Sequence, residues 1–276
     1  MDEAAAVAPE AGPSTGAIGA RGLRKEDARL LSGGGRYTAD IKLPHLAHAA
    51  FRRSDYAHAK ILRIDTAAAL AVPGVIAVCT AEDMRGQITK LRAQSRIAGS
   101  FGTENGALAD GEVRYVGEPV AIVVAESRYL AEDAAGLLTV EYEPLPAETD
   151  PEAAALPGAP LLHAAAPSNV LIERRLGRGD PEAAFARAAV VVGGRFRMTR
   201  KSVSAMECRA CIAEWERGRR FLRVHASTQQ PGVVRDSLVE ALGLAGHQVQ
   251  VIAPDVGGGF GGKGILYPDE LAVCVM

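Results

Sequence analysis

The segment DVGGGFGGKG, residues 255–264, concentrates glycine in a way that predicts a ligand-binding loop. Glycine lets the backbone adopt positive φ, or approach a ligand where a Cβ atom would clash. Gly257, Gly259 and Gly262 match the dinucleotide-binding pattern G-x-G-x-x-G. Gly257 and Gly262, followed by Lys263, also match the P-loop pattern G-x-x-x-x-G-K. Both patterns bind phosphate through backbone N–H groups, so the residues favour an anion-binding turn.

Neither phosphate pattern is complete. A P-loop needs Ser or Thr after the lysine to bind Mg²⁺, and Gly264 stands there. A dinucleotide fold needs a strand before the loop, which QVQVIAPDV supplies, then a helix and an acidic residue about 20 positions further on. The sequence ends at Met276, before that position. A nicotinamide-dependent oxidoreductase, and a glycine turn packed only against its own protein, are kept as alternatives.

Cys208 and Cys211 form C-x-x-C, which can bind zinc or carry redox chemistry. No second pair and no neighbouring histidine completes a zinc site, and no βαβ pattern precedes the pair. The six histidines are scattered, without H-x-H or H-E-x-x-H spacing. The surrounding SAMECRACIAEWE predicts instead the entry into a strand. We therefore expect no metal ligand among the side chains of this chain.

The composition is that of a soluble globular protein, with 276 residues, 48% hydrophobic and 23% charged residues and a formal net charge of −2. No basic excess favours nucleic acid or an anionic membrane. No apolar run approaches the ~18 residues of a membrane span. Residues 1–20 lack the basic and apolar regions of a signal peptide, so we expect a disordered tail in a cytoplasmic protein.

Alternating strand and helix patterns must position the glycine loop. We expect a short helix that ends at Gly33 to Gly35, and an irregular loop from about residue 87 to residue 111. PVAIVVA is expected as a buried strand, Ser127 as the N-cap of the next helix, and VEYEPLP as the strand that follows. The Pro/Ala-rich connector DPEAAALPGAP places a domain boundary at residue 150. Beyond it we expect a helix at VVRDSLVEALGLA, closed near Gly243 and Gly246, and four strands, at AVVVGGRFRM, CIAEWE, RFLRVHAS and QVQVIAPDV.

Several segments together resemble the molybdenum hydroxylases, the family of xanthine dehydrogenase, aldehyde oxidase and aerobic carbon monoxide dehydrogenase. DVGGGFGGK, preceded by STQQPGVVRDSLVEALGL, is similar to the molybdopterin-binding signature of the large subunit. Similar to its opening hammerhead domain are RKEDARLLSGGGRYTADI, FRRSDYAHAKILRID, PGVIAVCTAEDM and GEPVAIVVAESRYLAEDAA. LLHAAAPSNVL and MECRACIAEW resemble its next domain. The resemblance covers residues 20–276 in the family's order.

The resemblance implies an α+β chain with three parts. Residues 1–20 are the disordered tail, 21–150 an α/β hammerhead domain, and 151–276 the beginning of a mixed α/β molybdopterin-binding domain truncated at its C-terminus. The family's general-base glutamate lies further downstream, so we expect no catalytic base in this chain and a split-gene product, a truncation or a remnant. Glu207 and Glu270 are interpreted as ordinary surface carboxylates.

The resemblance also assigns the cofactor-binding residues: Gln229, Gly257, Gly258, Gly259, Phe260, Gly261, Gly262 and Lys263. Gln229 corresponds to the glutamine whose amide donates a hydrogen bond to an oxygen ligand of molybdenum without binding the metal. Phe260 is expected near the metal centre. Lys263 is expected to favour the anionic tail of the pterin, with a solvated lysine as the alternative.

The implied cofactor is molybdenum–molybdopterin in its cytosine dinucleotide form, with iron–sulfur clusters and FAD on partner chains. The expected partners are the remaining part of the molybdenum subunit, an iron–sulfur subunit and an FAD subunit. The implied reaction oxidises an aldehyde, an N-heterocycle or CO with water as the oxygen source. Gly264 stands where purine-oxidising members carry glutamate, which favours the aldehyde- or CO-dehydrogenase-like branch. A non-catalytic assembly or docking module remains the alternative of a different class.

Overall fold

The computed structural model describes residues 22–93, 95 and 97–276. The chain divides into two compact units, Met1–Arg36 and Tyr37–Met276, which are described separately. In the first unit, α1 (Asp27–Leu31) confirms the short helix expected before the glycines at 33–35. The disordered tail predicted for residues 1–20 lies outside the described residues.

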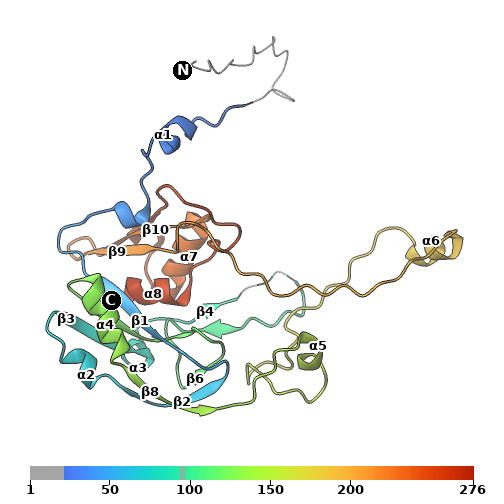
Figure 1. Cartoon of the computed structure of the whole chain (residues 1–276), viewed down its shortest axis with the longest axis horizontal. Helices are drawn as coiled ribbons and strands as arrows, with labels where there is room; N and C mark the ends of the chain where they lie inside the picture. Colours follow the sequence, from blue (N-terminus) through green and yellow to red (C-terminus); the bar gives the residue numbers. More distant parts are fainter. Residues whose placement is uncertain (1–21, 94, 96) are drawn as a thin grey trace, which may run out of the picture. The chain divides into compact units, whose positions relative to one another are not determined.

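The first sheet of the Tyr37–Met276 unit is centred on the predicted buried strand PVAIVVA, β7 (Pro119–Ala125). β7 pairs antiparallel with β1 (His48–Arg53) and β3 (Val75–Thr80) (Figure 1). Its residues 120–123 are completely buried. Ala121 and Val123 pack under α4 (Arg128–Gly136), whereas Val120 and Ile122, on the opposite face of the strand, belong to two other apolar clusters. The predicted N-cap is confirmed, since Ser127 Oγ accepts a hydrogen bond from Leu130 N at 3.3 Å.

Shorter elements complete this half of the unit. A second sheet has the order β6-β2-β8, and the predicted loop around residues 87–111 contains one small ladder, β4–β5. Their bounds, with those of the short helices beside them, are β2 (Ala59–Asp65), β4 (Leu91–Arg92), β5 (Glu104–Asn105), β6 (Glu112–Val113), β8 (Thr139–Pro144), η1 (Thr38–Asp40), α2 (Ala67–Leu70), α3 (Ala81–Met84) and α5 (Pro151–Ala154). α5 lies within the predicted connector, and the domain boundary at residue 150 stays a prediction.

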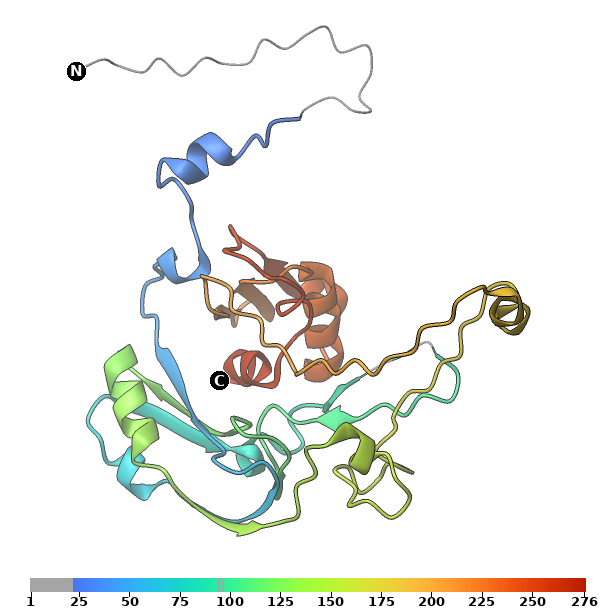
Figure 2. The same ribbon diagram turned by 45° about the vertical axis from the view of Figure 1, so that its right-hand side comes forward.

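The third sheet has the order β11-β10-β9 and carries the glycine loop (Figure 2). β10 (Phe221–Ala226) runs antiparallel to β9 (Cys211–Glu216) and parallel to β11 (Val249–Ile252). α7 (Pro231–Leu242) connects the two parallel strands, as such a pair requires, and η2 (Gly246–Gln248) precedes β11. Three of the four strands predicted beyond the boundary are thereby confirmed.

The predicted closure of α7 by glycine is also confirmed. Gly243 has φ of +63° and its N–H bonds to carbonyls of the last helical turn. The face of α7 that carries Val234, Leu238 and Ala241 is buried in the same core as Leu222 of β10. Burial of this apolar stripe holds the strand–helix–strand unit together.

The last helix, α8 (Pro268–Val275), is anchored by a buried ionic cluster. Asp269 accepts two hydrogen bonds from Arg209, at 2.7 and 2.8 Å, and one from Arg53 of β1 at 2.8 Å. Glu270 is only 9% exposed, so its interpretation as a surface carboxylate is wrong. It caps α8 by accepting from Tyr267 N at 3.1 Å, and Arg209 reaches it at 3.2 Å.

The strand predicted at AVVVGGRFRM is not formed. The chain runs as coil from the end of α6 (Pro181–Arg187) to the start of β9. A strand needs a neighbour to hydrogen-bond with, and none of the described residues pairs with this segment. Within the described part of the chain, no helix combines the length and apolar character needed to cross a bilayer.

Candidate functional site

The topology of the third sheet brings three sequence-distant segments to one edge. Residues 227–230 follow β10 and the glycine loop follows β11; because these strands are parallel, their carboxyl ends meet. β9 is antiparallel to β10, with Cys211 opposite Ala226, so the residues just before β9 arrive at the same edge. The edge beyond the carboxyl ends of parallel strands is where open α/β sheets bind ligands.

Gln229 and the glycine loop are joined by three hydrogen bonds. Gln229 Oε1 accepts from Gly261 N at 3.0 Å and from Lys263 N at 3.3 Å, and Gln229 N donates to Lys263 O at 2.9 Å. Two N–H donors can share only the oxygen of an amide, so the orientation of this side chain is fixed. Its Nε2 group has no hydrogen-bond partner among the described residues and is available to donate.

Three glycines of the loop are required by space. A Cβ atom on Gly259 would lie 2.4 Å from Cδ of Gln229, and one on Gly257 would lie 2.6 Å from Cβ of Glu207. On Gly262 it would lie 2.9 Å from Cβ of Val203. Any side chain at these positions would push the loop away from its neighbours. The loop is therefore packed against its surroundings as well as turned.

Three further positions of the loop have a left-handed backbone conformation. Gly258 and Gly261 have φ of +96° and +84°, and Phe260 between them has φ of +46°. Positive φ in a bulky residue costs about 1 kcal/mol or more and clusters at functional sites. The Phe260 side chain is also 78% exposed. The N–H groups of Gly258, Gly259 and Phe260 have no hydrogen-bond partner among the described residues. Gly259 is buried, whereas the ring of Phe260 is open to solvent.

Lys263 faces inward instead. Its Nζ atom donates to Ser227 Oγ at 2.7 Å, to Glu207 O at 2.9 Å and to Glu207 Oε2 at 3.0 Å. The lysine is 4% exposed, so the predicted solvated alternative does not hold. In this structure the ammonium group neutralises a carboxylate of its own chain, and the expected contact with an anionic tail remains untested.

Glu207 is a site residue that sequence reasoning missed. Its Oε2 atom also accepts from Ser227 Oγ at 2.6 Å and from Gly257 N at 2.7 Å, so one carboxylate holds both ends of the glycine loop. Burial alone would raise the pKa of Glu207, but the hydrogen bonds from Ser227, Gly257 and Lys263 outweigh it and lower the pKa. Lys263 was the sequence feature that could have indicated Glu207, because a lysine that is buried needs an acidic partner.

A cavity of about 920 Å³ lies beside this cluster, lined by residues 200–205 together with Glu207, Gly262 and Tyr267 among others. Glu207 Oε1 is buried and has no hydrogen-bond partner within the described part of the chain. Neither Gln229 nor Phe260 lines this cavity, and both side chains are exposed.

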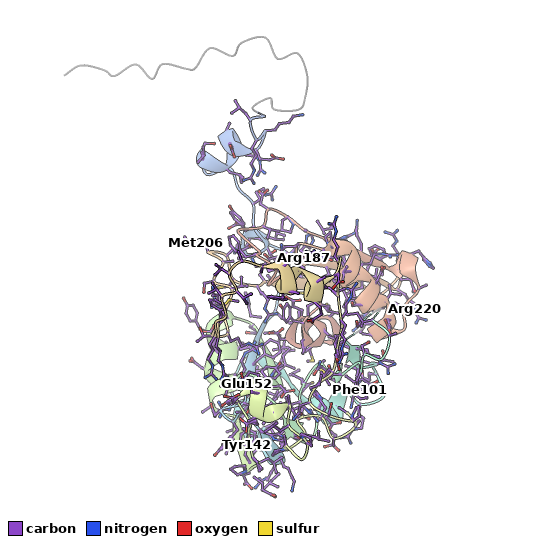
Figure 3. The ribbon with its side chains drawn as sticks, turned by 90° about the vertical axis from the view of Figure 1, so that its right-hand side faces the viewer. Phe101, Tyr142, Glu152, Arg187, Met206 and Arg220 are labelled. Carbon is purple, nitrogen blue, oxygen red and sulfur yellow. The ribbon has the colours of Figure 1, made fainter. Side chains whose placement is uncertain are left out.

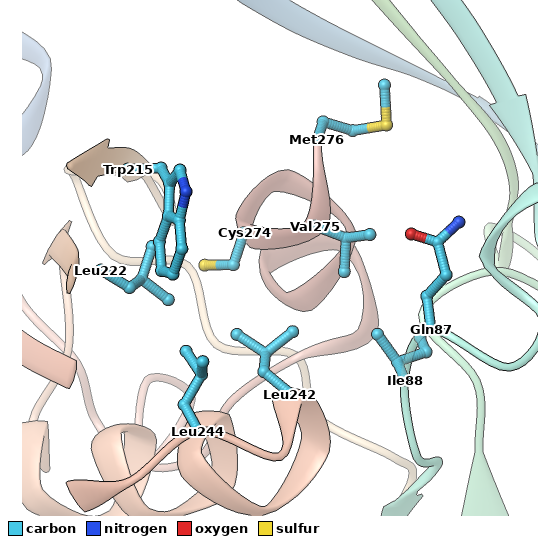
Figure 4. A pocket seen from close by; sticks show the side chains of 9 residues that line it. All are labelled: Gln87, Ile88, Trp215, Leu222, Leu242, Leu244, Cys274, Val275 and Met276. Atoms are coloured by element: carbon cyan, nitrogen blue, oxygen red, sulfur yellow. The ribbon is translucent and has the colours of Figure 1, made fainter. Parts of the chain in front are cut away.

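A separate pocket of about 270 Å³ lies at the end of α8 (Figure 4). Leu222 lies beside Trp215, Leu242 and Leu244 lie below Cys274, and Gln87 adds a polar side chain to the lining. It contains none of the predicted cofactor-binding residues.

The C-x-x-C cysteines are divided between two environments. Cys208 is exposed, whereas Cys211 begins β9 and is partly buried. A contact with Cys274 of α8, together with burial, raises the pKa of Cys211. Among the residues that the structure describes, no group of three or more His, Cys, Asp or Glu side chains could hold a metal ion.

Comparison with known proteins identifies the family. Residues 32–146 match the family model described as aldehyde oxidase and xanthine dehydrogenase, a/b hammerhead domain. Residues 162–276 match the molybdopterin cofactor-binding domain. The chain belongs to the molybdenum hydroxylase family. This membership confirms the α+β fold class, with a hammerhead domain followed by molybdopterin-binding sequence.

Individual molybdenum hydroxylases are similar over nearly the whole chain. The nicotine 6-hydroxylase large subunit of Paenarthrobacter nicotinovorans is 42% identical over 254 residues, which are 92% of this chain and 31% of that protein. The carbon monoxide dehydrogenase large chain of Afipia carboxidovorans is 38% identical, over 89% of this chain and 31% of that protein. The chain thus spans about a third of the length of these relatives.

Solved structures agree with this assignment. The crystal structure of quinoline 2-oxidoreductase from Pseudomonas putida 86 matches with a TM-score of 0.85 and 43% identity. That match covers 92% of this chain and 32% of the other. The sheet edge that carries Gln229 and the glycine loop therefore belongs to the part of a molybdenum hydroxylase described as cofactor-binding.

Proposed function

We propose that this chain is the molybdopterin-binding portion of a molybdenum-dependent oxidoreductase that works as part of a complex. The observation that carries the proposal is the Gln229 amide, fixed by two loop N–H groups with its own NH₂ group left to donate. It lies at the sheet edge where a ligand is expected, beside a turn with unpartnered N–H groups. An adjacent exposed ring, Phe260, has the apolar character suited to an organic cofactor.

The residues of this edge fit a molybdenum–pterin group, and their roles follow from their geometry. Gln229 Nε2 would donate a hydrogen bond to an oxygen atom of the group. The N–H groups of Gly258, Gly259 and Phe260 would donate to its other polar atoms. When bound, the group supplies the two-electron redox centre for oxidation of the substrate with water as the oxygen source. The hydrogen bonds of Glu207 with Gly257 and Lys263 stabilise the conformation of the glycine loop.

We also propose which form of the cofactor is bound and which partner chains complete the complex. We assign the cytosine dinucleotide form, with iron–sulfur clusters and FAD on partner chains in the cytoplasm. The remaining part of the molybdenum subunit completes the assembly, because the relatives are about three times as long as this chain. Two relatives above 40% identity are named for nicotine and quinoline, which supports an N-heterocycle ahead of an aldehyde or CO as substrate.

The nicotinamide alternative is weakened by the position of the next helix. In a dinucleotide fold the glycine motif opens directly into a helix whose N-terminus binds the pyrophosphate. Here α8 begins at Pro268, after five residues, 263–267, that follow the last glycine of the motif, Gly262. The first turn of α8 also carries the buried carboxylates of Asp269 and Glu270, which would repel a phosphate.

The proposal is tested by analysing the complex purified from the source organism through a tag on this chain. We expect about one molybdenum atom for each copy of the chain, a pterin that fluoresces after oxidation, and CMP released by acid hydrolysis. A complex with neither molybdenum nor pterin would support the assembly-module alternative, and bound NAD the nicotinamide one. GMP instead of CMP would correct only the cofactor form.

A further inference from the structure

Tyr267 is joined to the glycine loop by its hydroxyl group. The Oη atom donates a hydrogen bond to Gly262 O at 2.7 Å. Tyr267 lies directly before α8 and lines the cavity beside residues 200–205, which Gln229 does not line. Because the backbone N–H of Tyr267 already donates to Glu270, the side chain provides a second, separate contact.

Tyr267 and Gln229 bind opposite ends of one peptide group. The C=O of Gly262 and the N–H of Lys263 belong to the same peptide unit, and none of the described peptide bonds is cis. In a trans peptide these two groups point in opposite directions. The C=O accepts from Tyr267 Oη, and the N–H donates to Gln229 Oε1 at 3.3 Å. Rotation of this peptide would break both bonds, so the tyrosine fixes the direction of an N–H that orients the Gln229 amide.

The hydrogen bond to the carbonyl also strengthens the bond at the other end of the peptide. Donation to a C=O group polarises the N–H group of the same peptide, as in chains of hydrogen bonds. The bond from Lys263 N is the longer of the two that Gln229 Oε1 accepts, since Gly261 N lies at 3.0 Å. The contact from Tyr267 therefore supports the weaker of the two bonds that orient the amide.

The ring of Tyr267 is itself held in place by Arg209. The guanidinium carbon lies 4.1 Å from the centre of the ring, within range of a cation–π contact. Arg209 is fixed in turn, because both of its terminal nitrogens donate to the Asp269 carboxylate. Arg209 belongs to residues 206–209, which lead into β9, and Figure 3 labels the first of them, Met206. This segment and α8 together hold the hydroxyl group against the loop.

We propose that Tyr267 is a positioning residue for Gln229: its hydroxyl group fixes the Gly262–Lys263 peptide, and this peptide orients the amide. The inference deepens the proposed function and rests on it, because there the Gln229 Nε2 group donates to the molybdenum–pterin group. Tyr267 acts through the loop and does not contact the reacting atoms. Without its hydroxyl group the residues of the edge would all be present, but the amide would be less precisely oriented.

The first test compares Tyr267→Phe with Tyr129→Phe, which removes the hydroxyl group of a 79% exposed tyrosine on α4. Each variant is purified in the complex through a tag on this chain, and hydrogen exchange is resolved to single amides by mass spectrometry. In Tyr267→Phe we expect the Lys263 amide to exchange about fivefold faster, because one hydrogen bond is lost and the next is weakened. The amides of β7, in the first sheet, should exchange at the wild-type rate in both variants.

Two results of this experiment would contradict the proposal. Exchange of the Lys263 amide at the wild-type rate would show that the hydroxyl group does not fix the peptide. Faster exchange throughout β7 as well would show a general loss of stability in place of the local effect that positioning requires.

A double-mutant cycle tests whether Tyr267 acts through Gln229. Steady-state turnover of the complex is measured for Tyr267→Phe, for Gln229→Ala and for the double variant. We expect Tyr267→Phe alone to lower kcat about fivefold, and the double variant to turn over at the same rate as Gln229→Ala. An equal fractional loss of kcat from Tyr267→Phe in both backgrounds would overturn the proposal, because Tyr267 would then act independently of Gln229.

The outcomes separate this inference from the proposed function. A complex that contains molybdenum and pterin, but shows independent effects on kcat or an unchanged Lys263 amide, would refute only the role of Tyr267. A complex without molybdenum and pterin would refute the assigned cofactor, and the exchange measurement would still decide whether Tyr267 fixes the loop peptide.

Discussion

At the scale of single residues, the site depends on side chains whose partners are distant in sequence. Gln229 could be selected from the sequence only through its resemblance to the family signature, because an amide after a strand is otherwise unremarkable. Its contacts with Gly261 and Lys263 follow from the parallel pairing of β10 and β11. Glu207 was misjudged because burial of a carboxylate depends on the folded positions of Lys263 and Ser227, which no local pattern shows.

Replacement of Gln229 by alanine should lower turnover by about 10- to 100-fold in the assembled complex. The variant loses the donor at Nε2 and leaves Gly261 N and Lys263 N without their acceptor. The measurement is the steady-state rate with whichever aldehyde, N-heterocycle or CO the complex oxidises. Gln230→Ala removes the neighbouring exposed amide and should retain full activity. Equal rates for the two variants would remove Gln229 from the site.

Replacement of Glu207 by glutamine should destabilise the chain by about 3 kcal/mol. The buried ammonium of Lys263 then loses its counter-charge, whereas Gly257 N keeps an acceptor. Urea unfolding measures the loss. Adding Lys263→Met removes the isolated charge and should restore part of the stability; a double variant less stable than Glu207→Gln alone would contradict the pairing.

At the scale of elements, the sequence predicted what local pattern controls. β7, its Ser127 helix cap, α7 with its glycine end, and β9 to β11 all formed as expected because apolar periodicity and capping are local signals. The strand predicted at residues 189–198 did not form, because a strand also needs a neighbour. The glycine loop shows the same limit: its composition predicted a turn, but the reason for each glycine lies in Gln229, Glu207 and Val203.

Within the loop, Gly259→Ala should be destabilising by about 1–3 kcal/mol, because the new Cβ atom would overlap Gln229. Gly264→Ala is the matched control, since its Cβ atom would lie 3.5 Å from the nearest heavy atom and the backbone is not left-handed. Chemical denaturation of both variants gives the comparison. If Gly259→Ala were as stable as Gly264→Ala, the close approach of Gln229 to the loop would be wrong.

The anchoring of α8 should make stability depend on pH. Burial opposes ionisation of Asp269, but hydrogen bonds from Arg209 and Arg53 prevail and lower its pKa from 3.8 to about 2. The lowered pKa stabilises the folded state by about 2 kcal/mol above pH ~4, and this is lost as the pH falls towards 2. Asp269→Asn should flatten that acid limb in unfolding experiments. Asp236→Asn, at an exposed aspartate of α7, should leave it unchanged.

At the scale of the whole molecule, the main feature is the edge of the third sheet, which carries Gln229 and the glycine loop. The matched family domains account for most of the length of this chain, yet the two curated relatives are about three times as long as the chain. Substrate choice and the general base therefore belong, in our proposal, to polypeptide outside these residues. In the same proposal, the contribution of this chain is to hold one side of the cofactor.

The most direct test is the position of molybdenum in crystals of the purified complex, measured by anomalous scattering at the molybdenum edge. We predict one peak for each copy of the chain, beside the Gln229 amide and facing the turn at Gly258 to Phe260. A peak remote from both segments, or no peak in a complex that oxidises its substrate, would contradict the assignment of this edge as the cofactor site.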